Sequence, residues 1–350
     1  MYAPADLEAW VESVLVHFGA TPVDASVAAA ALIDADLSGV DTHGLYNFPT
    51  HWHYAPGLRS GDVTARRAMT TLRSNPSTTA WDAGATFGYI AEHHAVEAVC
   101  AMAAETGIGM LTWRNGCHFG AIGHAARMIA ARGYVGAVMC NMIPGAVPPG
   151  GRDKVFGTNP MAFAAPVPNR HPFAFDIATT ATAGTRLVMA RERGESIPLG
   201  WAVDGEGNPT TDPFEALKGG ALPFGSAEGN GYKGFGLGLM VDVLAGVLSG
   251  AGSGAFHVYQ PGYRQGAWFA AWKVDCFVDQ SEYDVEMGRL VDFITSSRPA
   301  PGNDVVTIPG DRAEATRQRR LRDGIPLSDV VVERNTVLGR ELGIEFPTPV

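Results

Sequence analysis

Over the first 55 residues, apolar positions recur at the three- and four-residue spacing of amphipathic helices. Thr21 and Pro22 have the residue types of a helix N-cap and first turn, and the alanine-rich helix that they begin ends at Gly39. Thr42 can cap a third helix, which we expect from about residue 44 to residue 54. The N-terminal segment is therefore predicted to be helical throughout.

From about residue 68 the pattern alternates between buried strands and helices. Strands are predicted at residues 78–84, 108–113, 134–141, 162–167, 173–179, near 255–259 and at 267–278; helices are predicted at 89–107, 118–133, 181–193, 232–250 and 281–296. The last 40 residues are again helical and are expected to pack on the N-terminal helices. The fold class is therefore α/β (α+β), with a helical domain of residues 1–67 and 311–350 and a sheet-and-helix domain of residues 68–310.

Charge and composition narrow the function classes. The net charge of −10 argues against nucleic acid as a partner, because binding to phosphates needs clustered Lys and Arg. The four cysteines are far apart and show no zinc-like spacing, which fits a reducing cytoplasm. The chain opens on an amphipathic helix rather than a basic, apolar leader, and it contains no apolar run long enough to cross a membrane. We expect a cytoplasmic enzyme or binding protein with a small-molecule ligand.

One glycine motif invites a dinucleotide interpretation that its context opposes. The letters "GNGYKG" at residues 229–234 match G-x-G-x-x-G, but the preceding "GGALPFGSAE" is rich in turn residues and cannot be a central strand. A Rossmann site needs that strand, so these glycines are expected to allow close backbone approach or to begin a buried helix. Lys233 remains of interest, because an ammonium beside a helix N-terminus favours phosphate.

Two of the ten histidines occupy positions suited to chemistry. His43 lies beside a hydroxyl at a predicted helix start, and His118 follows a strand and begins the next predicted helix. A metal site of His43, His51 and His53 is an alternative, although residues two apart on a helix face different directions and no H-E-x-x-H pattern occurs. We therefore expect proton transfer without a metal.

Around these histidines the chain resembles the malate/L-lactate dehydrogenases of the type 2, sulfolactate dehydrogenase-like superfamily, which includes ureidoglycolate dehydrogenase, 2,3-diketogulonate reductase and Δ1-piperideine-2-carboxylate reductase. Seven blocks carry the resemblance in order: "DTHGLYNFP", "RNGCHFGAIGHAARMIAARG", "GTNPMAFAAP", "FDIATT", "IPLGWAVDGEGNPTTDP", "GYKGFGLGLMVDVLAG" and "DGIPL". The resemblance implies a non-Rossmann domain that binds NAD or NADP, and a homodimer. It covers almost the whole chain.

By motif position, the resemblance also implies roles for individual residues. His43 would be the proton donor, Thr42 would relay the proton or orient the imidazole, and His118 would border the substrate. Further substrate residues would be Asn47, Phe119, Gly120 and Thr158, and the cofactor would contact Asp176, Ile177, Ala178, Thr179, Thr180, Tyr232, Lys233, Gly310 and Asp311. The reaction would interconvert a 2-oxo acid and a 2-hydroxy acid.

Asn47 departs from the family pattern, which has an arginine four residues after the histidine to bind the substrate carboxylate. Losing a charge-assisted hydrogen bond of this kind costs about 1.5–3 kcal/mol of binding. Either Arg114 or Arg186 supplies the missing cation, or the protein is an NAD(P)H-dependent reductase of a cyclic imine or of a ketone without that carboxylate. A metal-dependent hydrolase and a catalytically silent binding protein are rivals from other classes. Thr185 and Arg186 replace a family Gly-Lys pair, a second departure.

Overall fold

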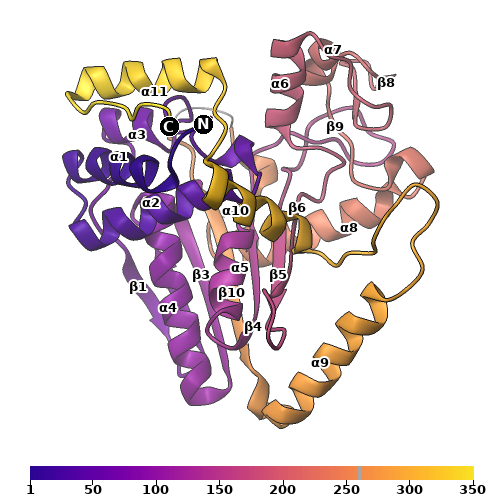
Figure 1. The fold of residues 1–350 in the computed structure, drawn as a ribbon. Coiled ribbons are helices and arrows are strands. Elements are labelled where there is room, and N and C mark those ends of the chain that lie inside the picture. Colours follow the sequence, from indigo (N-terminus) through magenta and orange to yellow (C-terminus); the bar gives the residue numbers. More distant parts are fainter. Residues whose placement is uncertain (259–261) are drawn as a thin grey trace.

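A computed structural model describes residues 1–258 and 262–350. Its centre is a sheet with the strand order β1-β2-β3-β10-β4-β5-β6 (Figure 1). The strands are β1 (Thr70–Ser74), β2 (Thr78–Asp82), β3 (Ile108–Gly116), β4 (Tyr134–Cys140), β5 (Met161–Ala165), β6 (Phe173–Ile177) and β10 (Gln265–Lys273). β2 and β3 pair in parallel, whereas β10 inserts antiparallel between β3 and β4. The predicted α/β fold class is confirmed.

Helices cover the two faces of this sheet. α4 (Gly88–Thr106) and α5 (Gly123–Ala130) pack their alanine-rich sides on one face, around Trp113, Phe119 and Phe269. α8 (Gly231–Val241), continued by a π-helical segment at Asp242–Val247, packs on the other. Because no strand immediately precedes α8, the structure agrees with the rejection of a Rossmann motif at residues 229–234.

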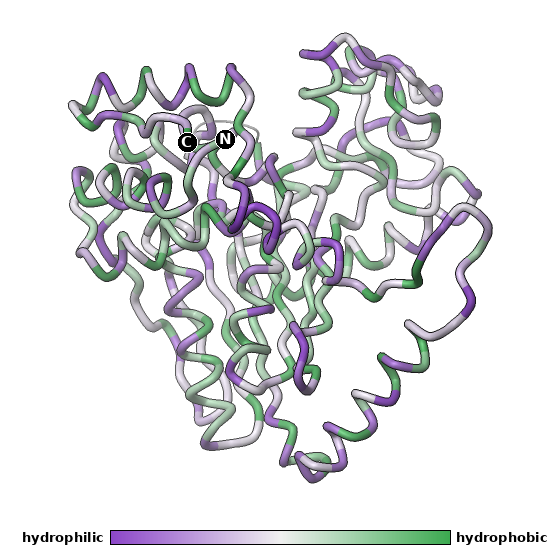
Figure 2. The backbone as a smooth tube through the Cα atoms, in the orientation of Figure 1, coloured by the Kyte–Doolittle hydropathy of each residue, from purple (hydrophilic) through white to green (hydrophobic). Residues whose placement is uncertain are grey.

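The two ends of the chain share one hydrophobic core. It joins α1 (Pro4–His17), α2 (Pro22–Leu37), α3 (Ala55–Ser60) and α11 (Asp329–Leu342). Trp10 of α1 packs edge-on against Phe346 with ring centroids 4.9 Å apart. In Figure 2 the central strands are largely hydrophobic, whereas α10 (Asp311–Asp323), in front of them, is hydrophilic. α10 therefore offers mostly polar side chains to its surroundings.

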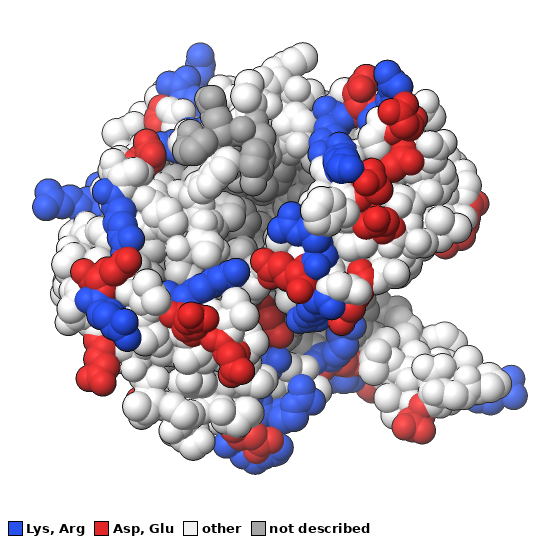
Figure 3. All heavy atoms as spheres, turned by 90° about the horizontal axis from the view of Figure 1, so that it is seen from above, with Lys and Arg blue, Asp and Glu red and all other residues white. Residues whose placement is uncertain are grey.

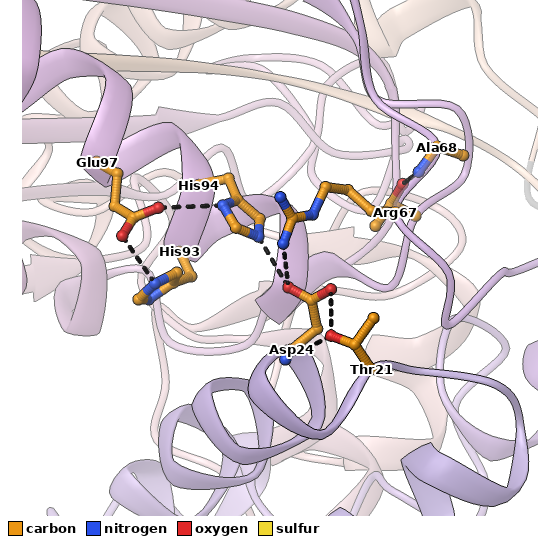
Figure 4. A network of polar contacts seen from close by, with 8 residues as sticks. Thr21, Asp24, Arg67, Ala68, His93, His94 and Glu97 are labelled. Carbon is orange, nitrogen blue, oxygen red and sulfur yellow. Dashed lines mark hydrogen bonds and ion pairs between the residues drawn. The ribbon is translucent and has the colours of Figure 1, made fainter.

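A buried carboxylate joins α2 to α4 (Figure 4). Asp24, which is 1% exposed, accepts hydrogen bonds from Thr21 Oγ1 (2.9 Å), Arg67 Nη2 (3.0 Å) and His94 Nε2 (2.8 Å). Such a buried charge is tolerated because its oxygens are hydrogen-bonded and paired with a cation. The contact anchors the helical layer to the helix that covers the sheet.

Residues 184–221 form a small lobe that the sequence pattern did not predict as a unit. It contains α6 (Gly184–Arg193), β7 (Ala202–Val203), β8 (Pro209–Thr210), α7 (Pro213–Lys218) and β9 (Gly220–Ala221) around its own apolar cluster. α9 (Gln280–Thr295) projects from the opposite end of the molecule in Figure 1. Within the described residues, no helix combines the length and apolarity needed to cross a membrane.

Three local predictions are wrong. Residues 44–54 form consecutive turns rather than a helix, because side chains take the place of helical backbone partners: Leu45 N–H donates to Asp36 Oδ2, and His53 N–H donates to His51 Nδ1. The strand predicted near 255–259 is instead a 3₁₀ turn at Gly254–Phe256, and residue 259 lies outside the described residues. The helix predicted from residue 118 begins only at Gly123, so His118 lies in a loop.

Candidate active site

The loop that carries His43 rests on a buried carboxyl group. Asp36 of α2 accepts the Leu45 N–H at 2.9 Å, and burial raises the pKa of its carboxyl to about 7. A Cβ on Gly44 would lie 2.2 Å from Asp36 Oδ2, so only glycine fits here. Arg320 of α10 donates to the Asp36 carbonyl and pairs with Asp41 at 2.5 Å. These contacts hold the Asp41–His43 turn in place.

His43 has one ring nitrogen held by its neighbour. Thr42 Oγ1 lies 2.8 Å from His43 Nδ1, and no partner for Nε2 occurs among residues 1–258 and 262–350. Two effects together lower the pKa of His43 to about 4: protein groups displace water from around the ring, and the nearby charge of Arg186 opposes a second positive charge. At neutral pH the imidazole is therefore uncharged and can accept a proton at Nε2 when Nδ1–H donates to Thr42.

His118 is held in one tautomer. Its Nδ1 lies 2.6 Å from Tyr54 Oη and also accepts the Gly120 N–H at 3.2 Å. Because the backbone N–H of Gly120 can only donate, Nδ1 is an acceptor and the ring proton resides on Nε2, so the Tyr54 hydroxyl also donates to Nδ1. Burial holds the pKa of His118 well below its usual value. His118 is thus suited to donate a hydrogen bond from Nε2–H rather than to exchange a proton.

Four imidazoles lie close together at this point. Ring centroids are 5.7 Å apart for His43 and His118, 4.6 Å for His51 and His118, and 5.5 Å for His51 and His53. His53 Nδ1 accepts the His118 backbone N–H at 2.8 Å, while its Nε2 lies 2.6 Å from the carbonyl of Tyr263. Burial lowers the pKa of His51 to about 3 and that of His53 to about 4.

These hydrogen bonds oppose the metal-dependent alternative. The Nδ1 atoms of His51, His53 and His118 all accept backbone N–H groups. Across the part of the chain that the structure describes, no three His, Cys, Asp or Glu side chains are arranged to hold a metal ion.

A cleft of about 1130 Å³ opens beside Thr42, the residue before His43; His43 itself is not among the residues that line it. Thr42, α2, α6, the start of α5 and the start of α10 line it. Figure 3 shows the surface hollowed between the helical layer and the small lobe, with charged side chains on both rims. The basic lining residues are Arg127, Arg186, Arg193, Arg312, Arg317, Arg319, Arg320 and the histidines His124 and His171. The cleft is therefore suited to an extended anionic ligand.

Several arginines of the cleft lack a carboxylate partner. Arg317 Nη1 pairs with Asp34 Oδ1 at 2.5 Å, and Arg127 also contacts Asp34. By contrast, Arg186, Arg193 and Arg312 form no ion pair with any residue that the structure describes. Their positive charge remains available to a bound molecule.

Three of the residues predicted to contact cofactor lie at or beside this cleft. Asp176, which lines it, accepts the Gly123 N–H at the start of α5 at 2.8 Å. Gly310, also in the lining, has φ of +110°, which favours glycine. Asp311 Oδ1 lies 2.8 Å from His171 Nε2, so its carboxylate fastens the start of α10.

The remaining predicted cofactor residues lie outside the cleft lining. Thr179 and Thr180 are buried, and their hydroxyls donate to backbone carbonyls, including that of Thr158 at 3.1 Å. Tyr232 and Lys233 are exposed on α8, with Lys233 Nζ 6.0 Å from the Tyr232 ring centroid. Ile177 and Ala178 end β6 and follow it. Cofactor contacts by these side chains stay a prediction.

None of the predicted substrate residues, Asn47, Phe119, Gly120 and Thr158, lines the cleft. Gly120 lies against Tyr89, where a Cβ would be 1.9 Å from the tyrosine hydroxyl oxygen. Phe119 is 1% exposed and packs on Trp113 and Phe269, and a substrate contact by its side chain stays a prediction. Asn47 Nδ2 donates to the Thr42 carbonyl at 2.6 Å and so braces the His43 loop.

Sequence reasoning missed the two tyrosines behind the histidines. Tyr54 fixes the tautomer of His118, and Tyr89 Oη donates to the His43 carbonyl at 2.9 Å. Both are at most 1% exposed. Buried aromatic residues are usually core residues, so no signal in the sequence separates these hydroxyls from others.

Comparison with known proteins places this architecture in one family. The family model for malate/L-lactate dehydrogenase matches residues 2–334. The chain is 33% identical to malate dehydrogenase of Pyrococcus horikoshii over 97% of its length and 94% of that protein. It is 34% identical to L-sulfolactate dehydrogenase of Methanothermobacter thermautotrophicus over 96% and 95%. It is also 29% identical to ureidoglycolate dehydrogenase (NAD(+)) of Escherichia coli over 92% and 91%.

Comparison with solved structures points to the same family. Sulfolactate dehydrogenase from Methanocaldococcus jannaschii superposes with a TM-score of 0.90 at 30% identity, covering 99% of this chain and 98% of that one. Δ1-piperideine-2-carboxylate reductase from Pseudomonas syringae superposes with a TM-score of 0.82 at 29% identity, covering 97% and 99%. The fold and the family match thus define an oxidoreductase that acts on CH–OH groups. The chain belongs to the malate/L-lactate dehydrogenase family.

Proposed function

We propose that this protein is an NAD(P)-dependent oxidoreductase that interconverts a 2-oxo acid and a 2-hydroxy acid with proton transfer by His43. The observation that carries the proposal is the His43 imidazole, held at Nδ1 by Thr42 beside a large arginine-lined cleft. Substrates that carry acid groups are implied by the names of the malate and sulfolactate dehydrogenases to which the chain is similar.

The cleft fits a dinucleotide in size and charge. Arg193 and Arg312, which have no carboxylate partner in the described ranges, would face its phosphates, and Asp176 and Gly310 line the same space. When bound, NAD or NADP supplies hydride transfer, the chemistry that no amino-acid side chain provides. Support for a nicotinamide cofactor comes from the E. coli relative, whose name specifies NAD(+).

Residues of this chain accept and return the proton that accompanies hydride transfer. In the direction of oxidation, neutral His43 accepts the hydroxyl proton of the substrate at Nε2, while Nδ1–H donates to Thr42. In the direction of reduction, the imidazolium returns that proton to the carbonyl oxygen. His118 Nε2–H would hydrogen-bond the same oxygen or its neighbour. General acid–base catalysis of this kind contributes about 10²–10⁴-fold to the rate.

Replacing each histidine by asparagine tests these roles. His43→Asn is expected to lower kcat by about 10²–10⁴-fold while the affinity for NADH or NADPH, measured by fluorescence titration, is retained. His118→Asn should mainly raise KM. His17→Asn on the outer helix α1 is the matched control and should behave as the wild type. Undiminished turnover in His43→Asn would contradict the proposal, as would failure of the wild type to bind either dinucleotide.

A second candidate is reduction of a cyclic imine or of a ketone without the usual carboxylate. Asn47 favours it, because an amide cannot replace the two charge-assisted bonds of an arginine, and its Nδ2 is already bonded to Thr42. The similarity to Δ1-piperideine-2-carboxylate reductase adds support. A panel of 2-oxo acids and cyclic imines, run with the wild type and with Asn47→Arg, decides between the two. If Asn47→Arg leaves activity on 2-oxo acids unchanged, a missing arginine at this position is not the reason for the substrate preference.

We also propose that the protein is a homodimer. Exposed apolar side chains gather on the projecting α9, where Val285, Leu290 and Phe293 are 66%, 52% and 78% exposed. Contiguous apolar surface of this kind is typical of subunit contacts. Light scattering is expected to give the mass of a dimer, and Phe293→Glu should shift it towards a monomer. A monomeric wild type would exclude this arrangement.

A further inference from the structure

The structure distinguishes the two arginines that the sequence offered as replacements for a clamp at position 47. Arg114 Nε pairs with Asp82 Oδ2 at 3.1 Å, and Arg114 does not line the cleft. Arg186, in the first turn of α6, is exposed on the cleft that Thr42 also lines. No ion pair engages Arg186 among residues 1–258 and 262–350. Of the two candidates, Arg186 therefore has the free charge on the side of the loop that carries His43, here called the catalytic loop.

Contacts between the small lobe and the catalytic loop keep α6 near His43. Tyr46, three residues after His43, donates a hydrogen bond from Oη to Glu192 Oε2 of α6 at 2.9 Å. Arg334 of α11 lies 3.7 Å from the other oxygen of Glu192 and 5.6 Å from the centroid of the Tyr46 ring. This three-residue junction, Tyr46–Glu192–Arg334, joins α6, the catalytic loop and α11.

The charge of Arg186 reaches the catalytic imidazole. It is the one charged group that lowers the pKa of His43 among the described residues, after the larger effect of desolvation. The other imidazoles near His43, those of His51 and His118, are neutral at pH 7, and Asp36 lies under the loop with a raised pKa. A guanidinium that acts on His43 is also within electrostatic range of a substrate held at His43.

We propose that Arg186 binds the carboxylate of the substrate, so that the small lobe supplies the cation that position 47 lacks. The inference rests on the proposed function and names the recognition element of the same site. A guanidinium binds a carboxylate through two parallel N–H···O bonds, which orients the acid as well as attracting it. The expected substrate class is therefore a 2-oxo or 2-hydroxy acid, or an imine that carries a carboxylate next to the reacting carbon.

Binding of a substrate carboxylate to Arg186 has a consequence for the pKa of His43. A carboxylate bound at Arg186 cancels the positive charge that disfavours imidazolium, so an acid substrate raises the pKa of His43 when it binds. A substrate without the acid group leaves that charge in place. Arg186 would thus discriminate against neutral carbonyl compounds both in binding and in proton transfer.

The test compares Arg186→Gln and Arg186→Lys with a matched control on the same helix. Arg191→Gln removes an equal charge from α6, but Arg191 lies over the Phe214 ring within the small lobe, 6.0 Å from its centroid. For the 2-oxo acid that the wild type reduces fastest, Arg186→Gln is expected to lower kcat/KM by about 10- to 150-fold. The lysine variant should recover part of this loss. Activity of Arg186→Gln on the corresponding 2-oxo amide should rise, because the charge that disfavours imidazolium is gone. The affinity of Arg186→Gln for NADH and NADPH, and the activity of Arg191→Gln, should stay as in the wild type.

A binding measurement separates this inference from the proposed function. Oxalate, a non-reacting dicarboxylate, is titrated into wild type and variants while the His43 ring signals are followed by NMR. We expect oxalate to shift these signals in the wild type and Arg191→Gln and not in Arg186→Gln, whether or not turnover is detected. Equal oxalate binding in wild type and Arg186→Gln, or no binding in either, would overturn the assignment. Loss of dinucleotide affinity in Arg186→Gln, with oxalate binding intact, would assign Arg186 to the cofactor instead.

Discussion

The hydrogen bond between Thr42 and His43 leads to a quantitative prediction. Thr42→Val removes the hydroxyl 2.8 Å from His43 Nδ1 and replaces it with a methyl group of nearly the same size. Because the size hardly changes, neither a cavity nor a clash accompanies the loss of the polar contact. Thr42 is half-buried at the edge of the cleft, so the global stability should change little.

The expected loss follows from the charge that His43 gains during the reaction. When Nε2 takes a proton, Nδ1–H becomes part of an imidazolium, and a hydrogen bond to a charged group contributes about 1.5–3 kcal/mol. Each 1.36 kcal/mol in the barrier changes the rate about tenfold. If the whole contact is lost in the transition state, kcat in Thr42→Val falls by about 10- to 150-fold.

The assay is the steady-state oxidation of NADH or NADPH with a 2-oxo acid, followed by absorbance, together with a fluorescence titration of the dinucleotide. Thr42→Ser is the control, since it keeps the hydroxyl and should retain most of the activity. The affinity for the dinucleotide should be unchanged in both variants. Wild-type kcat in Thr42→Val would refute the view that this hydroxyl holds the imidazole during proton transfer.

Three further predictions concern the support of the site. Gly44→Ala places a Cβ 2.2 Å from Asp36 Oδ2, so it should lower the free energy of unfolding by about 1–3 kcal/mol in urea denaturation and reduce kcat. Gly184→Ala, whose Cβ would have no atom within 4 Å, is the control and should change neither. Equal stability of the two variants would contradict this packing. Tyr54→Phe removes the donor 2.6 Å from His118 Nδ1 and should cost about 1 kcal/mol of stability and raise KM, with no change in KM as the contrary result. Stability should fall as the pH drops from 6.5 towards 4, because the histidines of the unfolded chain bind protons in this range. The same histidines do not bind protons in the folded site, where their pKa values are about 4 for His43 and His53 and about 3 for His51. The raised pKa values of the buried carboxyls of Asp36 (about 7), Asp176 (about 6) and Glu92 act in the opposite sense, so urea midpoints that rise on acidification would contradict the expected dominance of the histidines.

Local patterns were sufficient for most of the elements. Apolar periodicity predicted α1, α2, α4 and the central strands, because a buried face recurs along the chain at the period of its own element. The failures lie where tertiary contacts replace backbone ones. Residues 44–54 read as a helix, but Asp36 and His51 accept the N–H groups that would have continued it. The small lobe also escaped prediction, since its strands are only two residues long.

For the site, the sequence by itself determined that a hydroxyl and an imidazole stand side by side at residues 42 and 43, and that no arginine follows at 47. Only the tertiary structure decided which tautomer His118 adopts and which arginine faces the cleft. Those properties depend on partners far away in the chain: Tyr54 for His118, Asp82 for Arg114, and the Tyr46–Glu192 bond for α6. A hydrogen bond between distant residues needs only one suitable atom at each end, so it leaves no periodic trace in the sequence, whereas burial of a whole helix face leaves one in every turn.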